Sequence, residues 1–171
     1  DIKGFKIMIK IPELDISLLE ALVELDKWLK KNNLYLELKI IDASALCLHH
    51  VEIDRPTIDI DLANDINNNV ILEKVEEIGK SHGLGSTWLE TPGITLPDFV
   101  TFKSHKLFNS LSHIDAKIAD LKTLLSLKIC AYHDRMNETQ VDLQDAQAII
   151  DYGVILSEDV LAFAISNIKN S

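Results

Sequence analysis

The sequence predicts an α+β fold, in which a small sheet with flanking helices is followed by a C-terminal helical segment. Two segments in the front half, 34–41 and 57–62, have the alternating pattern of strands, in which successive side chains point to opposite faces. From Asp120 onward the chain shows helical character and no further strand pattern. We therefore expect an α+β core over residues 1–119 and a helical part over residues 120–171 that packs on it.

The front half is expected to begin with an amphipathic helix over Asp15–Lys31. Its apolar side chains recur at helical spacing, Asp15 or Ser17 can cap its start, and two lysines at its end complement the helix dipole. Leu34–Ile41 alternates and then becomes wholly apolar, which is typical of a strand entering a core. Ala43–His50 is short and apolar, so we expect a helix packed on that strand.

The middle of the chain combines strand, helix and loop patterns. Thr57–Leu62 alternates acidic and aliphatic residues with period two, which predicts a strand with one acidic face. Asn69–His82 is an amphipathic helix pattern that ends at glycines. Ser86–Pro97 is rich in proline and glycine and predicts a loop. Strand-like pieces follow at Phe99–Phe102 and Ala116–Ala119.

Three helices are expected in the back third. Asp120 can cap the first, Leu121–Arg135, and Gly153 ends the second, Leu143–Tyr152. Ser157, which two acidic residues follow, is expected to start the last helix.

The composition excludes several classes of protein. The 171 residues are 47% hydrophobic and 26% charged, with only 6 Gly and 4 Pro, which excludes disordered and collagen-like chains. The net charge of -10 repels phosphate backbones, so we expect no broad nucleic-acid binding, while an RNA acceptor entering through a local basic patch stays open. No apolar run can span a bilayer and no signal-peptide pattern is present, so we expect a cytoplasmic protein without membrane contact.

Two aspartates at a spacing of two residues are the strongest chemical signal. Asp59 and Asp61 lie on the same face of the predicted strand, where two carboxylates repel each other unless a cation lies between them. Mg²⁺ is commonly held by one or two carboxylates together with substrate phosphates, so this pair is a candidate metal site for phosphoryl or nucleotidyl transfer. The alternative, which the bare alternation favours, is a surface strand with its polar face in water.

Two patterns in the chain carry a resemblance to a known family. The first is the predicted strand, turn and short helix followed by Arg55-Pro56-Thr57-Ile58-Asp59-Ile60-Asp61-Leu62. The second is Leu127-Lys128-Ile129-x-Ala131-x-x-x-Arg135 followed by Asp142-Leu143-x-Asp145. Together they resemble the nucleotidyltransferase superfamily of the DNA polymerase beta type, in the branch that contains abortive-infection toxins of type IV toxin–antitoxin systems. The resemblance implies a small mixed sheet with flanking helices.

The resemblance also implies a reaction and roles for residues. The reaction is the Mg²⁺-dependent transfer of a nucleotidyl group from a nucleoside triphosphate to an unknown acceptor, in a protein with a possible antitoxin-like partner. The implied metal ligands are Asp59 and Asp61, and Lys128 would contact the triphosphate. The implied supporting residues are Asp142 or Asp145 as a further acidic position, Arg55 and Thr57 as braces of the catalytic strand, and Ser44 and Arg135 as further candidates for substrate contact.

The turn before the short helix departs from the family pattern. The family has Gly-Gly or Gly-Ser where this chain has Asp42-Ala43-Ser44, and glycine there lets backbone N–H groups approach phosphates. A second hypothesis is therefore a catalytically degenerate member that keeps the fold for binding a protein, for which the acidic surface suits a basic partner. An Asp42 side chain directed away from the aspartate pair favours the enzyme, and one directed toward it favours the degenerate protein.

Other assignments remain open at this stage. Lys128 and Arg135 can instead pair with nearby aspartates simply to dock two helices. His113 and the pair His133-Asp134 resemble the signature of a phosphohydrolase family, a histidine plus a His-Asp pair, but that fold is all-helical and conflicts with the strand patterns. Both tryptophans are expected to be core or loop anchors, and of the two only Trp88, beside the Pro/Gly loop, could line a pocket.

Overall fold

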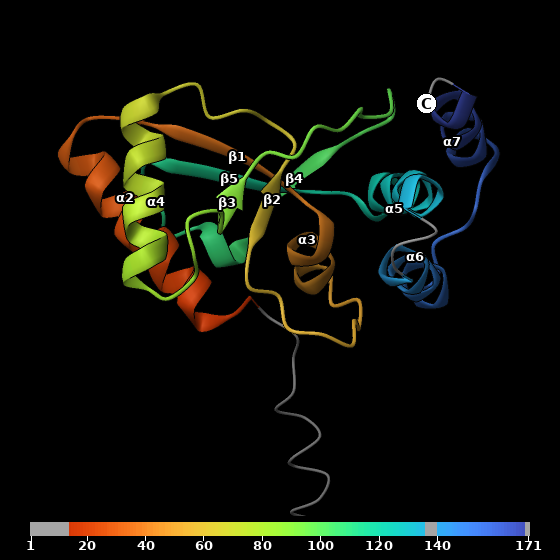
Figure 1. The fold of residues 1–171 in the computed structure, drawn as a ribbon, viewed down its shortest axis with the longest axis horizontal. Helices are drawn as coiled ribbons and strands as arrows, with labels where there is room; N and C mark the ends of the chain where they lie inside the picture. The colour runs from red at the N-terminus through yellow and green to blue at the C-terminus, as the bar shows by residue number, and fades with distance from the viewer. Residues whose placement is uncertain (1–13, 136–139, 170–171) are drawn as a thin grey trace, which may run out of the picture.

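The structure is a computed structural model that describes residues 14–135 and 140–169. Over this part of the chain a five-stranded mixed sheet and six α-helices form the predicted α+β fold (Figure 1). Residues 1–13 lie outside the described residues. They begin the expected 1–119 core, and the expectation of no signal peptide is drawn from them. Within the described ranges no helix has the length and apolar character needed to cross a membrane.

The sheet has the strand order β3-β2-β1-β5-β4. The strands are β1 (Leu36–Ile41), β2 (Ile60–Leu62), β3 (Leu89–Glu90), β4 (Phe102–Ser104) and β5 (Ile114–Ala119). The central strand β1 pairs in parallel with β5 and antiparallel with β2, and β4 pairs antiparallel with β5. A short 3₁₀ helix, η1 (Lys106–Phe108), lies between β4 and β5 and was not predicted.

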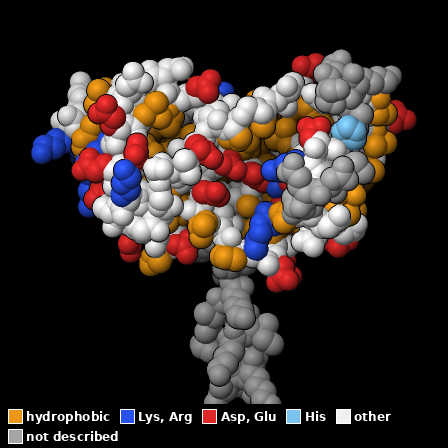
Figure 2. All heavy atoms as spheres, viewed as in Figure 1, with side chains coloured by type: hydrophobic (Ala, Val, Ile, Leu, Met, Phe, Trp, Pro, Cys, Tyr) orange, Lys and Arg blue, Asp and Glu red, His pale blue; other side chains and the backbone are white. Residues whose placement is uncertain are grey.

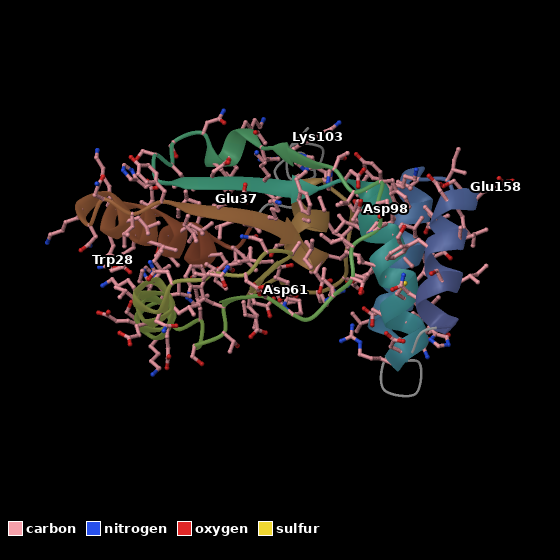
Figure 3. The ribbon with its side chains drawn as sticks, turned by 90° about the horizontal axis from the view of Figure 1, so that it is seen from above. Trp28, Glu37, Asp61, Asp98, Lys103 and Glu158 are labelled. Carbon is pink, nitrogen blue, oxygen red and sulfur yellow. The ribbon has the colours of Figure 1, made fainter. Side chains whose placement is uncertain are left out.

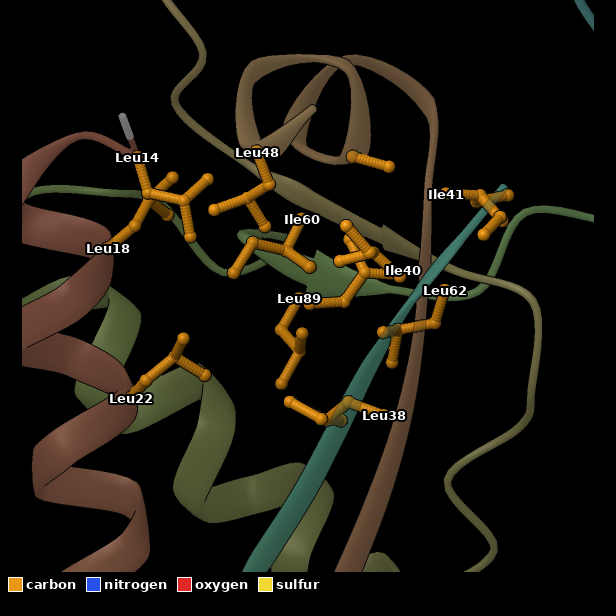
Figure 4. Close-up of a cluster of buried hydrophobic side chains, with 14 of the residues drawn as sticks. Leu14, Leu18, Leu22, Leu38, Ile40, Ile41, Leu48, Ile60, Leu62 and Leu89 are labelled. Atoms are coloured by element: carbon orange, nitrogen blue, oxygen red, sulfur yellow. The ribbon is translucent and has the colours of Figure 1, made fainter. Parts of the chain in front are cut away.

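Helices α2 (Ile16–Lys31) and α4 (Asn69–Ser81) cover one face of this sheet (Figure 3). As predicted, the Asp15 carboxylate caps α2 by accepting a hydrogen bond from the backbone N–H of Ser17 at 2.8 Å. Leucines of α2 pack against alternate side chains of β1, β2 and β3 to form the core shown in Figure 4. The alternation seen in the sequence thus marks the buried face of each strand.

The remaining helices lie at one end of the sheet (Figure 1). α3 (Asp42–Leu48) follows β1 directly, and α5 (Leu121–Arg135) starts just after β5, where the Asp120 carboxylate accepts a hydrogen bond from the Thr123 N–H at 3.0 Å. α6 (Val141–Tyr152) and α7 (Glu158–Lys169) pack against α5. This arrangement brings the helical part against the end of the sheet where β1, β2 and α3 meet.

Several predicted boundaries differ from those observed. The strand expected over Thr57–Leu62 is limited to Ile60–Leu62, because β1 has only Ile40 and Ile41 to pair with it. The strand expected over Phe99–Phe102 is instead Phe102–Ser104, which pairs with β5. The predicted loop 86–97 contains β3, a two-residue edge strand too short to produce an alternating pattern.

Candidate functional site

A cleft of about 680 Å³ lies between the sheet and the C-terminal helices. Its walls come from the ends of β1 and β2, the loop after β3, and helices α5, α6 and α7. Acidic side chains gather in the hollow between the two halves of the molecule (Figure 2). Figure 3 shows Asp61 toward the end of the sheet that lies nearer to the C-terminal helices.

Asp42, the first residue of α3, enters this cleft directly after β1. Its φ of 63° lies in the left-handed region, which glycine adopts most readily. Its carboxylate forms an ion pair with the ammonium of Lys128 and a hydrogen bond with Asp61. Burial raises the pKa of Asp42, but the charge of Lys128 and these hydrogen bonds outweigh burial and leave the pKa below its ordinary value. The Asp42 side chain is therefore directed toward the aspartate pair.

Asp59 and Asp61 both line the cleft, although only Asp61 lies within β2. The pKa of Asp61 is raised to about 7, first by burial, then by its hydrogen bond to Asp42 and by the charges of Asp42, Asp59 and Glu90. Burial, followed by the charge of Asp42, also raises the pKa of Asp59. Below about pH 7 Asp61 is therefore expected to be protonated and able to donate to Asp42. These carboxylates are crowded enough to favour a cation between them.

Ser44 and Thr57 support this segment from behind and do not line the cleft. The buried Ser44 hydroxyl donates to the backbone carbonyl of Asp59 at 2.6 Å. The Thr57 hydroxyl lies 3.3 Å from the thiol of Cys47, and both side chains are buried. These contacts fix the backbone that presents Asp59, which agrees with a bracing role for Thr57 and gives Ser44 the same role.

Lys128 lies at the bottom of the cleft and is 5% exposed. Besides its pair with Asp42, its Nζ lies 2.8 Å from Asp145 Oδ2 and 3.4 Å from Asp142 Oδ1. Burial lowers the pKa of Lys128, but the charges of Asp42 and Asp145 raise it above its ordinary value. The ammonium is thus held charged by three carboxylates.

The two aspartates of α6 bind three cations that come from two segments, α5 and the segment before β2. Asp145 accepts a bidentate pair of hydrogen bonds from the Arg55 guanidinium, at 2.6 and 2.7 Å. It also forms an ion pair with Lys128. Asp142 accepts from Arg135 Nη2 at 2.7 Å. Since both carboxylates are almost fully buried, they join α6 to α5 and to the segment before β2. The helix-docking alternative for Lys128 and Arg135 thus describes real contacts, and it does not exclude a role in the cleft.

The structure brings five of the nine predicted site residues to the cleft surface. These are Asp59, Asp61, Lys128, Arg135 and Asp142, whereas Ser44, Arg55, Thr57 and Asp145 lie behind it. Two residues that the sequence did not indicate, Glu90 and Phe163, also line the cleft. Their only sequence signal is their type, because β3 is too short to show a pattern and Phe163 is one apolar residue in an amphipathic helix.

Trp88 belongs to the core, in agreement with its interpretation as a core or loop anchor, and does not line the cleft. Trp88 is 1% exposed, and its indole N–H donates to the carbonyl of Val75 at 2.6 Å. The histidines of the phosphohydrolase alternative are separated: His113 stacks on Tyr35 beside another cavity of about 490 Å³, whose lining does not include His133.

The carboxylates of the cleft are the groups to consider as ligands of a metal ion. Across the described ranges, no group of three or more His, Cys, Asp or Glu side chains is arranged to hold a metal ion. The crowded pair Asp59 and Asp61 still fits the usual environment of Mg²⁺, which takes one or two carboxylates and completes its shell with substrate phosphates and water. These two residues are thus the ones that would hold such an ion.

Comparisons of the chain with protein-family models, with curated proteins and with solved structures found no match.

Proposed function

We propose that this protein is a Mg²⁺-dependent nucleotidyltransferase that moves a nucleotidyl group from a nucleoside triphosphate to an acceptor hydroxyl. The observation that carries the proposal is the convergence of Asp59 and Asp61 with Lys128 and Arg135 in one cleft. These residues come from motifs about 70 positions apart in the sequence, and each motif resembles a segment of the nucleotidyltransferase superfamily.

Different residues of the cleft would bind the metal ion and the phosphates of a triphosphate. Mg²⁺ would bind the carboxylates of Asp59 and Asp61 and supply charge neutralisation on the phosphates and on the departing pyrophosphate. Lys128 and Arg135 supply positive charge on the helical side, and the buried carboxylates of Asp142 and Asp145 orient them. Because six carboxylates and only two cations among the described residues line the cleft, bound Mg²⁺ would have to supply most of the positive charge that a triphosphate requires.

The reaction is tested with nucleoside triphosphates labelled at the α- or the γ-phosphate, incubated with Mg²⁺ and with separate pools of RNA, protein and small molecules. Nucleotidyl transfer moves the α label to an acceptor and releases the γ label as pyrophosphate. We expect α-label transfer that Asp59→Asn and Asp61→Asn each abolish. The matched control is Asp65→Asn, an exposed carboxylate outside the cleft. Transfer of the γ label instead would identify a kinase and reject the proposal.

A second candidate, a catalytically degenerate protein that binds a protein partner, is favoured by the direction of Asp42. Its carboxylate approaches Asp61 and pairs with Lys128, so it adds negative charge where the resembling family has glycine and competes with phosphate for the lysine. The acidic surface, with a net charge of -10, suits a basic partner such as the expected antitoxin-like protein.

Asp42→Gly separates the two candidates. Glycine accepts the left-handed backbone of this turn, and its introduction frees Lys128 from one of its three carboxylates. In a degenerate protein, wild type binds no nucleoside triphosphate and Asp42→Gly gains binding. In an active enzyme, wild type already binds, and the substitution changes affinity without creating it.

A further inference from the structure

Three apolar side chains also line the cleft. Ile94 of the loop after β3, Leu127 of α5 and Phe163 of α7 line it, and all three are partly exposed. Leu127 directly precedes Lys128 on α5, and both line the cleft, so the helix presents an apolar and a cationic side chain to the same space. A ligand with an apolar part and an anionic part would therefore find a contact for each on this helix.

The aromatic ring of Phe163 is held in position by a second ring. Phe99 meets it edge to face, with centroids 6.3 Å apart and an interplanar angle of 74°, a favourable aromatic geometry. The Lys122 ammonium lies 4.4 Å from the centroid of Phe99. Beyond Phe163, the Asn167 side-chain amide donates to the Phe163 carbonyl at 2.9 Å, and Asn167 also lines the cleft.

We propose that this apolar wall, formed by Ile94, Leu127 and Phe163, binds the base of a nucleotide, with Phe163 as the residue that contacts its aromatic face. The inference rests on the proposed function for the identity of the anionic part, a phosphate chain at Lys128 and Arg135. A nucleotide joins a flat aromatic base to such a chain, whereas an inorganic polyphosphate has no part that the apolar wall could bind. Asn167 stands at the edge of the wall, where its amide oxygen can accept a hydrogen bond from the base.

The test compares binding of the four ribonucleoside triphosphates and of inorganic tripolyphosphate, each with Mg²⁺, by equilibrium dialysis. Aromatic contacts to a base are commonly strong enough that Phe163→Ala should weaken nucleotide binding about tenfold and leave tripolyphosphate binding unchanged. Phe163→Trp keeps an aromatic face and should retain nucleotide binding. Leu161→Ala, two residues earlier on α7 and exposed outside the cleft, is the matched control.

Each outcome separates this inference from the proposed function. Base-dependent binding that Phe163→Ala weakens, without any α-label transfer, supports the wall and rejects the enzyme. Equal binding of tripolyphosphate and nucleotides, unaffected by Phe163→Ala, would overturn the inference that the wall binds a base. In that case the α-label transfer assay still decides separately whether the protein is an enzyme. No binding of any nucleotide by wild type overturns the wall, and a loss of both ligands in Phe163→Ala does so as well.

Discussion

Asp61 is the residue whose chemistry depends most strongly on its neighbours. Its pKa is raised to about 7 by burial and then by Asp42, Asp59 and Glu90, so the folded protein binds a proton there that the unfolded chain, with an ordinary aspartate pKa, releases near pH 4. The folded state therefore loses stability as the pH rises from about 4 to about 7, and the loss is complete above that range. Without a cation, this carboxylate destabilises the fold at neutral pH.

Asp61→Asn should therefore stabilise the metal-free protein at pH 8. Because Asp61 is partly exposed and solvent screens its interactions, we expect a gain of about 1 kcal/mol in the free energy of unfolding. Urea denaturation in a chelating buffer at pH 8 and pH 4.5 measures the gain, which should shrink at the lower pH. Asp65→Asn should show no such difference, and an Asp61→Asn that is less stable than wild type at pH 8 would contradict the electrostatics described here.

For single residues, the sequence predicts which side chains share a site better than it predicts the direction in which each side chain points. The two-residue spacing predicted that Asp59 and Asp61 lie together, and both do line one cleft. The direction of Asp42 could not be predicted, since it depends on a left-handed turn that the residue type does not specify. The partners of Lys128 were foreseen only in part, because its contact with Asp42 joins residues far apart in the sequence.

Helix α4 contributes to the fold through a close approach that only glycine permits. A Cβ at Gly79 would lie 2.1 Å from the carbonyl oxygen of Gly85 and 2.3 Å from Trp88. The approach allows the Trp88 indole to donate to the Val75 carbonyl and packs the segment before β3 against α4. The Glu90 edge of the cleft thus depends on how closely this helix meets the strand that follows it.

Gly79→Ala should destabilise the protein by about 1–3 kcal/mol, although alanine favours helices, because the added methyl group overpacks a backbone contact. Thermal unfolding followed by circular dichroism measures the effect. Gly93→Ala, where a Cβ meets no atom within 4 Å, should leave the melting temperature nearly unchanged. Equal effects of the two substitutions would show that the close approach is not needed.

The elements themselves were predicted more reliably than their ends. Helices α2 and α4 follow clear periodicity and caps, α5 follows its Asp120 cap, and all three agree closely with the prediction. The edge strand β3 was missed and the strand before it was too long, because strand ends depend on the partner strand and not on local sequence. The loop that contains β3 is also the one that carries Ile94 to the cleft.

In the whole molecule, buried ion pairs connect the helical part to the sheet. Asp145 of α6 holds Lys128 of α5 and Arg55 of the segment before β2. Burial raises the pKa of Asp145, but the hydrogen bond from Arg55 and the charge of Lys128 lower it more, so that it lies below its ordinary value. The stabilisation that this carboxylate provides is therefore present above about pH 4 and is lost as the pH falls through the lowered pKa.

Asp145→Asn should destabilise the protein by about 3 kcal/mol at pH 7, because it leaves Lys128 buried with less compensation. The difference from wild type, measured by urea denaturation, should decrease below pH 4. Glu76→Gln removes an exposed pair with Lys80 and should cost about 0.5 kcal/mol or less. If Asp145→Asn lowers the free energy of unfolding as little as this control does, the ion pairs do not stabilise the contact between the helical part and the sheet.

The cleft as a whole was only partly predictable. The two motifs indicated which residues share a site, and the charge pattern indicated a cation, yet the apolar wall depends on how α7 lies against α5 and on the course of the loop after β3. Such contacts between distant segments follow from packing and leave no periodic signal in the sequence.

The central claim, a Mg²⁺-dependent triphosphate site at Asp59 and Asp61, is tested most directly by calorimetric titration of a nucleoside triphosphate in the presence and absence of Mg²⁺. We predict saturable binding by wild type that requires the ion, persists in Asp65→Asn, and disappears in the double variant Asp59→Asn/Asp61→Asn. Binding that is independent of Mg²⁺ or undiminished in the double variant, or no binding by wild type, would contradict the claim.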